Sequence, residues 1–465
     1  MNQPRINIKW YVLVDVLAAM LTWVCFYYLR TLIYRCGFSI PPGFYLGGFL
    51  YTIGWVTLYF LTGAYESIYQ KTVLDEFFKT LIVTIIGCLL LLFFFILKNP
   101  QENNEDYYLE FFSLLGPVFV VTFLFRLPFI NNAKKQLRNE KVFFNVLLIG
   151  TQKNATQFFN SFLKTKEKKG YQITSFLNTN GKQLSSLPHS IKNYNGLDNL
   201  TMIIEADKIE EVIITVDKNE RDLLTNILQK LSDKDVNIKI TPDRVDIISG
   251  ALKTNSLSGI PLIDVHSGQL PVWQKNIKRF IDLSVSILGL IILSPLLLYT
   301  AIRTRLSSKG PVFFLQERIG YKGKAFTILK FRSMVEDAEK DGPALSSDND
   351  TRITNWGKIM RKWRLDELPQ LVNIIKGEMS LVGPRPERKF YVNEIVQQHP
   401  EYNYLFKVKP GLSSWGMVKF GYASTIEEMV QRMQYDLLYI ENVSILLDLE
   451  IMLLTLRIIF AGKGK

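Results

Sequence analysis

The sequence predicts a membrane protein in three parts: a bundle of four transmembrane helices, a small α/β domain, and a C-terminal α+β domain with a re-entrant membrane helix. Three observations support this fold class. Four long apolar runs fill the first third of the chain, strand and helix patterns alternate in the middle, and a fifth apolar run has basic residues on both sides. The length of 465 residues suits several domains better than a single core.

Four apolar runs, each close to the length that spans a bilayer, occupy about residues 10–29, 44–64, 80–97 and 111–130. We therefore expect a four-helix transmembrane domain over residues 1–132. The first run is long, aromatic and followed by Arg30 rather than by a cleavage site, so it is not expected to be a signal peptide. One acidic residue, Asp15, interrupts it. We expect this side chain near the membrane interface rather than in a polar contact inside the bundle.

The charge pattern predicts how the bundle is oriented. The loop before the fourth run is acidic, whereas the segment after it carries Lys134, Lys135, Arg138 and Lys141. By the positive-inside rule the rest of the chain faces the cytoplasm, although Arg30 and Arg35 would then lie outside. A net charge of +12 with 48% hydrophobic residues suits an integral membrane protein with basic cytosolic surfaces that contact anionic lipids. It does not indicate nucleic acid, because no nucleic-acid-binding motif is present.

The middle of the chain, residues 142–250, alternates strands and helices. Strands are predicted at residues 143–150, 211–216 and 237–242, with helices at 151–165 and 222–232. This alternation is typical of a small parallel, Rossmann-like domain. A dinucleotide-binding loop needs three spaced glycines after the first strand, and only Gly150 is present. We therefore expect a degenerate domain with a structural or regulatory role.

A fifth apolar run, at about residues 280–302, has basic residues on both sides. Because both flanks favour the cytoplasm, a simple crossing would place one basic cluster on the wrong side of the membrane. Ser294 and Pro295 interrupt the run, and a proline there removes an amide hydrogen bond, so we expect a bend. A re-entrant helical hairpin, which enters and leaves one leaflet, satisfies both observations. The alternative is a kinked fifth transmembrane helix.

The polar C-terminal region contains WRLDELPQLVNIIKGEMSLVGPRP, residues 363–386, in which Asp366 and Glu367 are adjacent. Apolar residues recur at helical spacing after Glu367, Pro369 is tolerated in a first helical turn, and Gly377 follows as a stop. Asp366 is therefore expected at the N-cap of a short amphipathic helix. An aspartate there is usually only a cap, and its functional interest comes from the basic residues around it.

Six basic residues are the candidate phosphate ligands of this region: Lys330, Arg332, Arg352, Arg361, Arg364 and Arg385. Lys330 and Arg332 lie at the end of a predicted strand, and Arg385 is held between two prolines that restrict the backbone. Guanidinium groups beside a helix N-terminus bind phosphate well. In a domain without a Gly-rich phosphate loop, this set indicates a diphosphate cradle.

Adjacent residues at a helix start point about 100° apart, so Asp366 and Glu367 can serve different ligands. An aspartate carboxylate can attack phosphorus and form an acyl phosphate, and nearby cations keep it ionised. A hard cation such as Mg²⁺, bound by Glu367 and by the phosphates of a substrate, would neutralise the leaving group. The pair therefore allows one carboxylate to attack while the other holds a metal.

From residue 275 to the C-terminus the sequence resembles the monotopic phosphoglycosyltransferases, the bacterial sugar transferase family that makes polyprenyl-diphosphate sugars. The resemblance rests on KRFIDLSVSILGLIILSP, GPVFFLQERIGYKGKAFTILKFRSM, LDELPQL, NIIKGEMSLVGPRP and VKPGLSSWGMV. The preceding parts resemble the large form of the family, in which a CoA-binding-like domain precedes the catalytic one. The expected domains are 1–132, 142–250 and 275–465, with a linker at 251–274 and the membrane hairpin at about 280–302.

The resemblance implies a two-step reaction at the cytoplasmic face of the bacterial inner membrane. Asp366 would attack the sugar-linked phosphate of a UDP-sugar with release of UMP, and polyprenyl (undecaprenyl) phosphate would then take the phosphosugar. Glu367 would bind Mg²⁺, and Ser294 with Pro295 would form the break in the hairpin. The product would begin the synthesis of an exopolysaccharide, capsule or O-antigen. The identity of the sugar and the formation of a homodimer stay open.

Two departures from the family pattern lie in these motifs: a Thr-Ser pair is replaced by Trp363 and Arg364, and a Thr-Gly pair by Ser413 and Ser414. They could alter the choice of sugar or the contacts to the nucleotide. A catalytically inactive membrane scaffold for polysaccharide assembly is the main alternative function, and the intact acidic pair with its cations argues against it. A membrane nucleotide-sugar dehydratase would need a Gly-x-Gly-x-x-Gly loop, which the chain lacks.

Overall fold

The computed structural model describes residues 5–462 except 34, 36, 38–39, 41, 67, 99–103, 165–169, 180–187, 189–190, 217–219, 232–233, 235, 243–261, 265–269, 337 and 339–349. Most of the expected linker at 251–274 lies outside the described residues. The chain divides into two compact units. The first contains Met1–Phe144, and the second contains Asn145–Lys168, Ile173–Pro271 and Lys278–Lys465.

Four long helices make up most of the first unit: α1 (Ile8–Ile33), α2 (Phe44–Leu61), α3 (Val73–Lys98) and α4 (Asn104–Arg138). A short 3₁₀ helix, η1 (Ile68–Gln70), precedes α3. All four long helices are long and apolar enough to cross a membrane, which confirms the predicted spans. Both α1 and α3 pack along α4, and aromatic side chains such as Phe26, Trp55 and Tyr59 fill the space between the helices.

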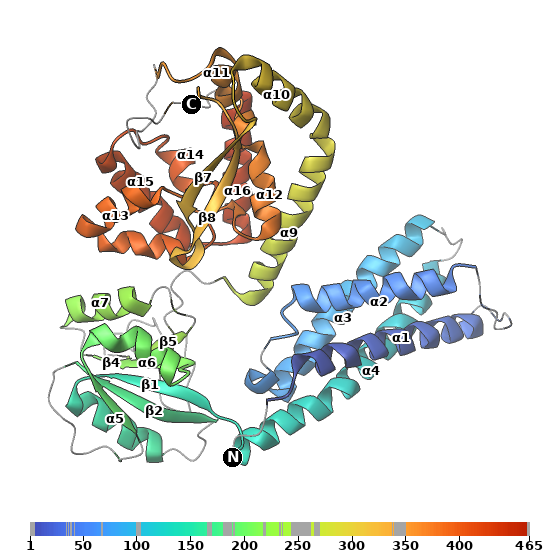
Figure 1. Cartoon of the computed structure of the whole chain (residues 1–465). Helices are drawn as coiled ribbons and strands as arrows, with labels where there is room; N and C mark the ends of the chain where they lie inside the picture. Colours follow the sequence, from blue (N-terminus) through green and yellow to red (C-terminus); the bar gives the residue numbers. More distant parts are fainter. Residues whose placement is uncertain are drawn as a thin grey trace. The chain divides into compact units, whose positions relative to one another are not determined.

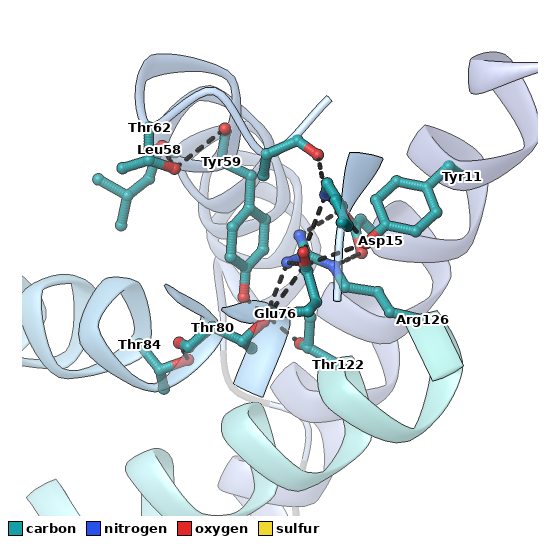
Figure 2. A network of polar contacts seen from close by, with 12 residues as sticks. Tyr11, Asp15, Leu58, Tyr59, Thr62, Glu76, Thr80, Thr84, Thr122 and Arg126 are labelled. Atoms are coloured by element: carbon teal, nitrogen blue, oxygen red, sulfur yellow. Dashed lines mark hydrogen bonds and ion pairs between the residues drawn. The ribbon is translucent and has the colours of Figure 1, made fainter. Parts of the chain in front are cut away.

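A buried ionic network joins three of these helices (Figure 2). Arg126 of α4 is 1% exposed, and its Nη2 and Nε donate to the two carboxylate oxygens of Asp15 at 2.6 and 2.9 Å. Its Nη1 donates to Glu76 at 2.8 Å, and Lys71 lies 2.9 Å from the other oxygen of Glu76. The guanidinium also lies 4.1 Å from the ring centroid of Tyr59. The expectation that Asp15 makes no polar contact inside the bundle was therefore wrong, because Arg126 pairs with it there.

A second ion pair involves Arg30, which the predicted orientation places on the outer side of the membrane. Nε of Arg30, near the end of α1, lies 3.0 Å from Oε1 of Glu110, near the start of α4. Glu110 is buried. Since the two charges neutralise each other, Arg30 is compatible with an orientation that leaves the basic end of α4 in the cytoplasm.

One sheet forms the core of the α/β domain, in the order β3-β2-β1-β4-β5-β6. Its strands are β1 (Phe144–Gly150), β2 (Tyr171–Asn178), β3 (Lys192–Asn195), β4 (Glu211–Thr215), β5 (Asn237–Ile240) and β6 (Ile263–Asp264). The pairings β2·β3, β1·β4 and β4·β5 are parallel, and β6 runs antiparallel to β5. Of the helices α5 (Gln152–Lys164), α6 (Leu200–Ala206) and α7 (Arg221–Leu231), the last two cover one face and α5 lies on the other (Figure 1). The Rossmann-like prediction is confirmed.

Gly150, the last residue of β1, has a packing role. A Cβ at this position would lie 2.2 Å from the hydroxyl oxygen of Thr215, at the end of the neighbouring strand β4. The close approach of the two strands therefore explains the glycine without any phosphate ligand.

The C-terminal region is a mixture of helices and short strands. It begins with α9 (Val272–Ile292) and α10 (Ser294–Ser307), followed by the antiparallel hairpin of β7 (Phe313–Ile319) and β8 (Ala325–Phe331). A parallel pair, β9 (Ser380–Val382) and β10 (Gly411–Ser413), lies farther along the chain. The helices of the region after β8 are α11 (Asn355–Lys362), η4 (Leu365–Gln370), α12 (Leu371–Lys376), α13 (Lys389–Gln398), η5 (Pro400–Lys407), α14 (Trp415–Lys419), α15 (Ile426–Glu441) and α16 (Ile445–Phe460). The predicted α+β class is confirmed.

The predicted bend lies between α9 and α10, whose axes differ by 64°. Pro295 stands in the first turn of α10, where its missing N–H is harmless. The hydroxyl of Ser294 donates to the carbonyl of Ile291 at 2.8 Å and satisfies an acceptor at the break. Asp282, Ser286, Thr300 and Thr304 are buried, whereas the exposed side chains include Leu288, Ile292, Leu298 and Ile302. The helix pair therefore presents an apolar outer face that suits lipid.

Candidate active site

The acidic pair lies at a sharp turn between two helices. After α11, Arg364 adopts a left-handed conformation with φ 53°, and the 3₁₀ helix η4 begins at Leu365. Asp366 and Glu367 lie in its first turn and are buried. The prediction that Asp366 is an N-cap was therefore wrong, because the N-cap position is held by Arg364, two residues earlier. The predicted stop at Gly377 is confirmed by its positive φ of 86°.

Glu367 lies at the centre of a cationic cradle. Nζ of Lys330, from β8, lies 3.1 Å from its Oε1, and Nη1 of Arg385 lies 3.8 Å from the same atom. Nε of Arg364 donates to Oε2 at 2.9 Å, and Nη2 contacts this oxygen too. Burial alone would raise the pKa of Glu367. The cations, with Arg364 foremost, outweigh burial and hold the pKa well below its usual range, so this carboxylate stays ionised.

Asp366 has the opposite electrostatic behaviour. Burial and the adjacent negative charge of Glu367 raise its pKa. The positive charges of Lys330, Arg361 and Arg364 only partly offset these effects. Two neighbouring carboxyl groups whose pKa values are driven apart are typical of sites at which the two groups have different chemical roles.

A second buried carboxylate, Glu387, supports the cradle from behind. Nη2 of Arg432, from α15, donates to it at 2.7 Å, and Nη1 of Arg318, from β7, donates at 3.1 Å. Nε of Arg385 lies 3.6 Å away. Arg385 is thus shared between Glu367 and Glu387. The glutamate directly after Pro-Arg-Pro is the one local sequence signal for this cluster, and it was not among the predicted site residues.

The remaining predicted phosphate ligands have contacts of their own. Nε of Arg361 donates to the hydroxyl of Ser333 at 3.0 Å, and the arginine acts on Asp366 through its charge. Arg352 forms a paired contact with Asp350 at 2.6 and 2.8 Å. The cations that the structure gathers directly on Glu367 are Lys330, Arg364 and Arg385. Arg332, which is buried, contacts a backbone carbonyl instead.

The donor set at the acidic pair fits a magnesium ion that arrives with a substrate. Among the described residues, no group of three or more His, Cys, Asp or Glu side chains converges on one point. Mg²⁺ usually binds through one or two carboxylates together with substrate phosphates. Asp366 and Glu367 can supply such carboxylates, although Glu367 would have to share its oxygens with Lys330 and Arg364.

Comparison with known proteins gives these residues a context. The family described as Bacterial sugar transferase matches residues 273–462. A UDP-N-acetylgalactosamine-undecaprenyl-phosphate N-acetylgalactosaminephosphotransferase of Aeromonas hydrophila is 40% identical over 45% of this chain and 51% of its own length. A UDP-glucose:undecaprenyl-phosphate glucose-1-phosphate transferase of Klebsiella pneumoniae is 36% identical over 57% of each chain. The chain thus spans about half the length of these curated relatives.

A third relative is matched over most of its length. An uncharacterized sugar transferase of Bacillus subtilis is 37% identical over 40% of this chain and 89% of its own length. The family match covers the bent helix pair, the acidic pair with its cradle, and the cluster around Glu387. From these matches we conclude that the chain belongs to the bacterial sugar transferase family.

Proposed function

We propose that the chain transfers a sugar 1-phosphate from a UDP-sugar to undecaprenyl phosphate and releases UMP. The buried pair of Asp366 and Glu367 inside its cationic cradle carries this proposal. The names of the Aeromonas and Klebsiella relatives support the two substrate classes. The product, a lipid-linked sugar diphosphate, would begin the assembly of an exopolysaccharide, capsule or O-antigen.

The first step forms a covalent intermediate. A carboxylate oxygen of Asp366 attacks the phosphorus that carries the sugar, and the bond from that phosphorus to the bridging oxygen breaks. UMP leaves with the bridging oxygen and the electron pair of the broken bond. Lys330, Arg364 and Arg385 stabilise the charge that develops on the phosphoryl oxygens.

The second step regenerates the enzyme. A phosphate oxygen of undecaprenyl phosphate attacks the same phosphorus, and the acyl-phosphate bond to Asp366 breaks. The carboxylate of Asp366 is restored, and the lipid-linked product departs.

Glu367 would hold Mg²⁺ together with the diphosphate, and the ion would supply charge neutralisation on the leaving phosphate.

The membrane arrangement follows from the same proposal, because a soluble UDP-sugar and a lipid phosphate can meet only at an interface. The α9–α10 pair would enter and leave the cytoplasmic leaflet, with its apolar outer face in lipid. A cysteine introduced by Ser308→Cys should then react with a membrane-impermeant maleimide only from the cytoplasmic side. Labelling from the outside would make the pair a broken transmembrane span.

UMP release tests the proposed activity. The full chain, in membrane fractions with short polyprenyl phosphates, is offered a panel of UDP-sugars, and UMP is measured. We expect release with at least one donor, none from Asp366→Asn, and wild-type release from Glu401→Gln, which changes an acid outside the cradle. Near-normal turnover of Asp366→Asn would remove this residue from the mechanism. Absence of UMP with every donor would favour a scaffold.

A further inference from the structure

Arg332 is a buried cation with an incomplete set of partners. Its side chain is 6% exposed, and Nη2 donates to the carbonyl of Ser308 at 2.7 Å. Its Nε and Nη1 are buried and have no hydrogen-bond partner among the described residues. Two arginines that are equally buried, Arg126 and Arg432, each contact a carboxylate. The carboxylate of Glu336 is close by, since the Cβ position at Gly310 lies 2.1 Å from Nη1 of Arg332 and 3.1 Å from Oε2 of Glu336, but the two side chains form no hydrogen bond or ion pair. The buried guanidinium thus keeps two unused donors, which an added anion would satisfy.

This guanidinium lies at the point where the apolar helix pair joins the polar part of the region. Ser308, its partner, directly follows α10, and Leu306 two residues earlier is 76% exposed. The backbone around it makes room for the side chain. Gly310 has a φ of 115°, and a Cβ there would lie 2.1 Å from Nη1 of Arg332. An anion bound to Arg332 would therefore lie beside the membrane-facing surface of α10.

Arg332 also lies next to Lys330, a cation of the cradle, along the line of β8. Its N–H donates to the carbonyl of Val312 at 2.9 Å, so it continues the strand pairing of β8. Lys330 and Arg332 are two residues apart and share one side of the strand, with Cα atoms roughly 7 Å apart. Lys330 contacts Glu367. An anion bound to Arg332 would therefore lie beside the cradle without taking part in its ion pairs.

We propose that Arg332 binds the phosphate group of the acceptor lipid, a polyprenyl phosphate. This assignment rests on the proposed function and divides the basic residues between two substrates. The lipid phosphate needs a cation next to a membrane surface, because its tail stays in the bilayer, and Arg332 meets that requirement. The soluble donor has no tail in the bilayer, so its diphosphate does not need a cation next to the membrane. It binds at the cations that surround Glu367.

Two measurements on the full chain in nanodiscs test the assignment separately for each substrate. The first is the affinity for a short-chain polyprenyl phosphate without donor, and the second is the single-turnover burst of UMP from a UDP-sugar without acceptor. We expect Arg332→Gln to weaken lipid phosphate binding at least tenfold and to keep the burst within twofold of wild type. Arg332→Lys should restore part of the binding. Arg305→Gln is the matched control, since Arg305 is a nearby arginine that donates to the carbonyl of Gly310.

The other outcomes have distinct meanings. Unchanged lipid phosphate binding in Arg332→Gln, or a burst reduced as strongly as the binding, would overturn the assignment. Equal effects of Glu336→Gln and Arg332→Gln on lipid binding would also overturn it, because Arg332 would then serve an ion pair with its neighbour. A wild-type protein that binds the lipid phosphate but never releases UMP would refute the proposed function and leave the binding assignment in place.

Discussion

Replacing Arg126 with methionine should destabilise the transmembrane bundle strongly. The change leaves Asp15 buried opposite no cation, while Glu76 keeps Lys71 at 2.9 Å. Removing one partner of a buried ion pair costs about 3–5 kcal/mol. Asp15→Leu should be milder, because Arg126 keeps Glu76 at 2.8 Å, and we expect a loss of about 1–3 kcal/mol.

The double variant separates pairing from simple loss of packing. In Arg126→Met with Asp15→Leu, neither charge of the pair is left behind, so the total loss should be smaller than the sum of the single losses by about 2 kcal/mol. Lys134→Met, which changes an exposed lysine on α4, is the matched control and should stay within about 0.5 kcal/mol of wild type.

Unfolding of the full chain in mixed micelles with increasing dodecyl sulfate gives the free energy of unfolding for each variant. Additive effects within about 0.5 kcal/mol, or an Arg126→Met variant as stable as Lys134→Met, would refute the view that the buried network stabilises the bundle. A loss confined to activity, with unchanged unfolding, would contradict the same reasoning.

Three further predictions concern the C-terminal region. Asp366→Asn should raise the free energy of unfolding by about 1 kcal/mol, because it removes a buried carboxyl whose pKa is raised by burial. Thermal melts measure the change, and a lower melting temperature of the variant would contradict this reasoning. Burial raises the pKa of Asp436 to about 6, so the folded state holds a proton that the unfolded state releases. Stability from this group should fall by about 3 kcal/mol as pH rises from about 4 to about 6, and Asp436→Asn should flatten that part of a pH–stability curve. EDTA should stop UMP release and Mg²⁺ should restore it, whereas full activity in EDTA would exclude the proposed metal.

Features that depend on one short window of sequence were predictable. The four apolar runs correspond to α1 to α4, the pattern at residues 143–165 corresponds to β1 and α5, and Pro295 lies at a bend of 64°. Each of these rests on hydrophobic periodicity or on the chemistry of one residue. The polar edge strand β3, with the sequence KNYN, has no such signal and was missed.

Contacts between distant residues account for what was not predicted. Asp15 and Arg126 are 111 residues apart, so Asp15 seemed to have no partner. Arg432 and Glu387, which support the cradle, are 45 residues apart and come from different elements. The left-handed backbone of Arg364 moved the start of the helix, and no rule of capping signals it when the residue is neither glycine nor asparagine.

That backbone conformation at Arg364 has a mechanical consequence. A side-chain-bearing residue in the left-handed region stores roughly 1–3 kcal/mol of strain, and the contacts of Arg364 with Glu367 help to maintain it. A phosphate that draws the guanidinium away from Glu367 would weaken this restraint and let the turn relax. Electrostatic capture of a substrate would thus be transmitted through the two peptide units between Arg364 and Asp366 to the spacing of the two carboxylates, and Arg364→Gly would uncouple the two events.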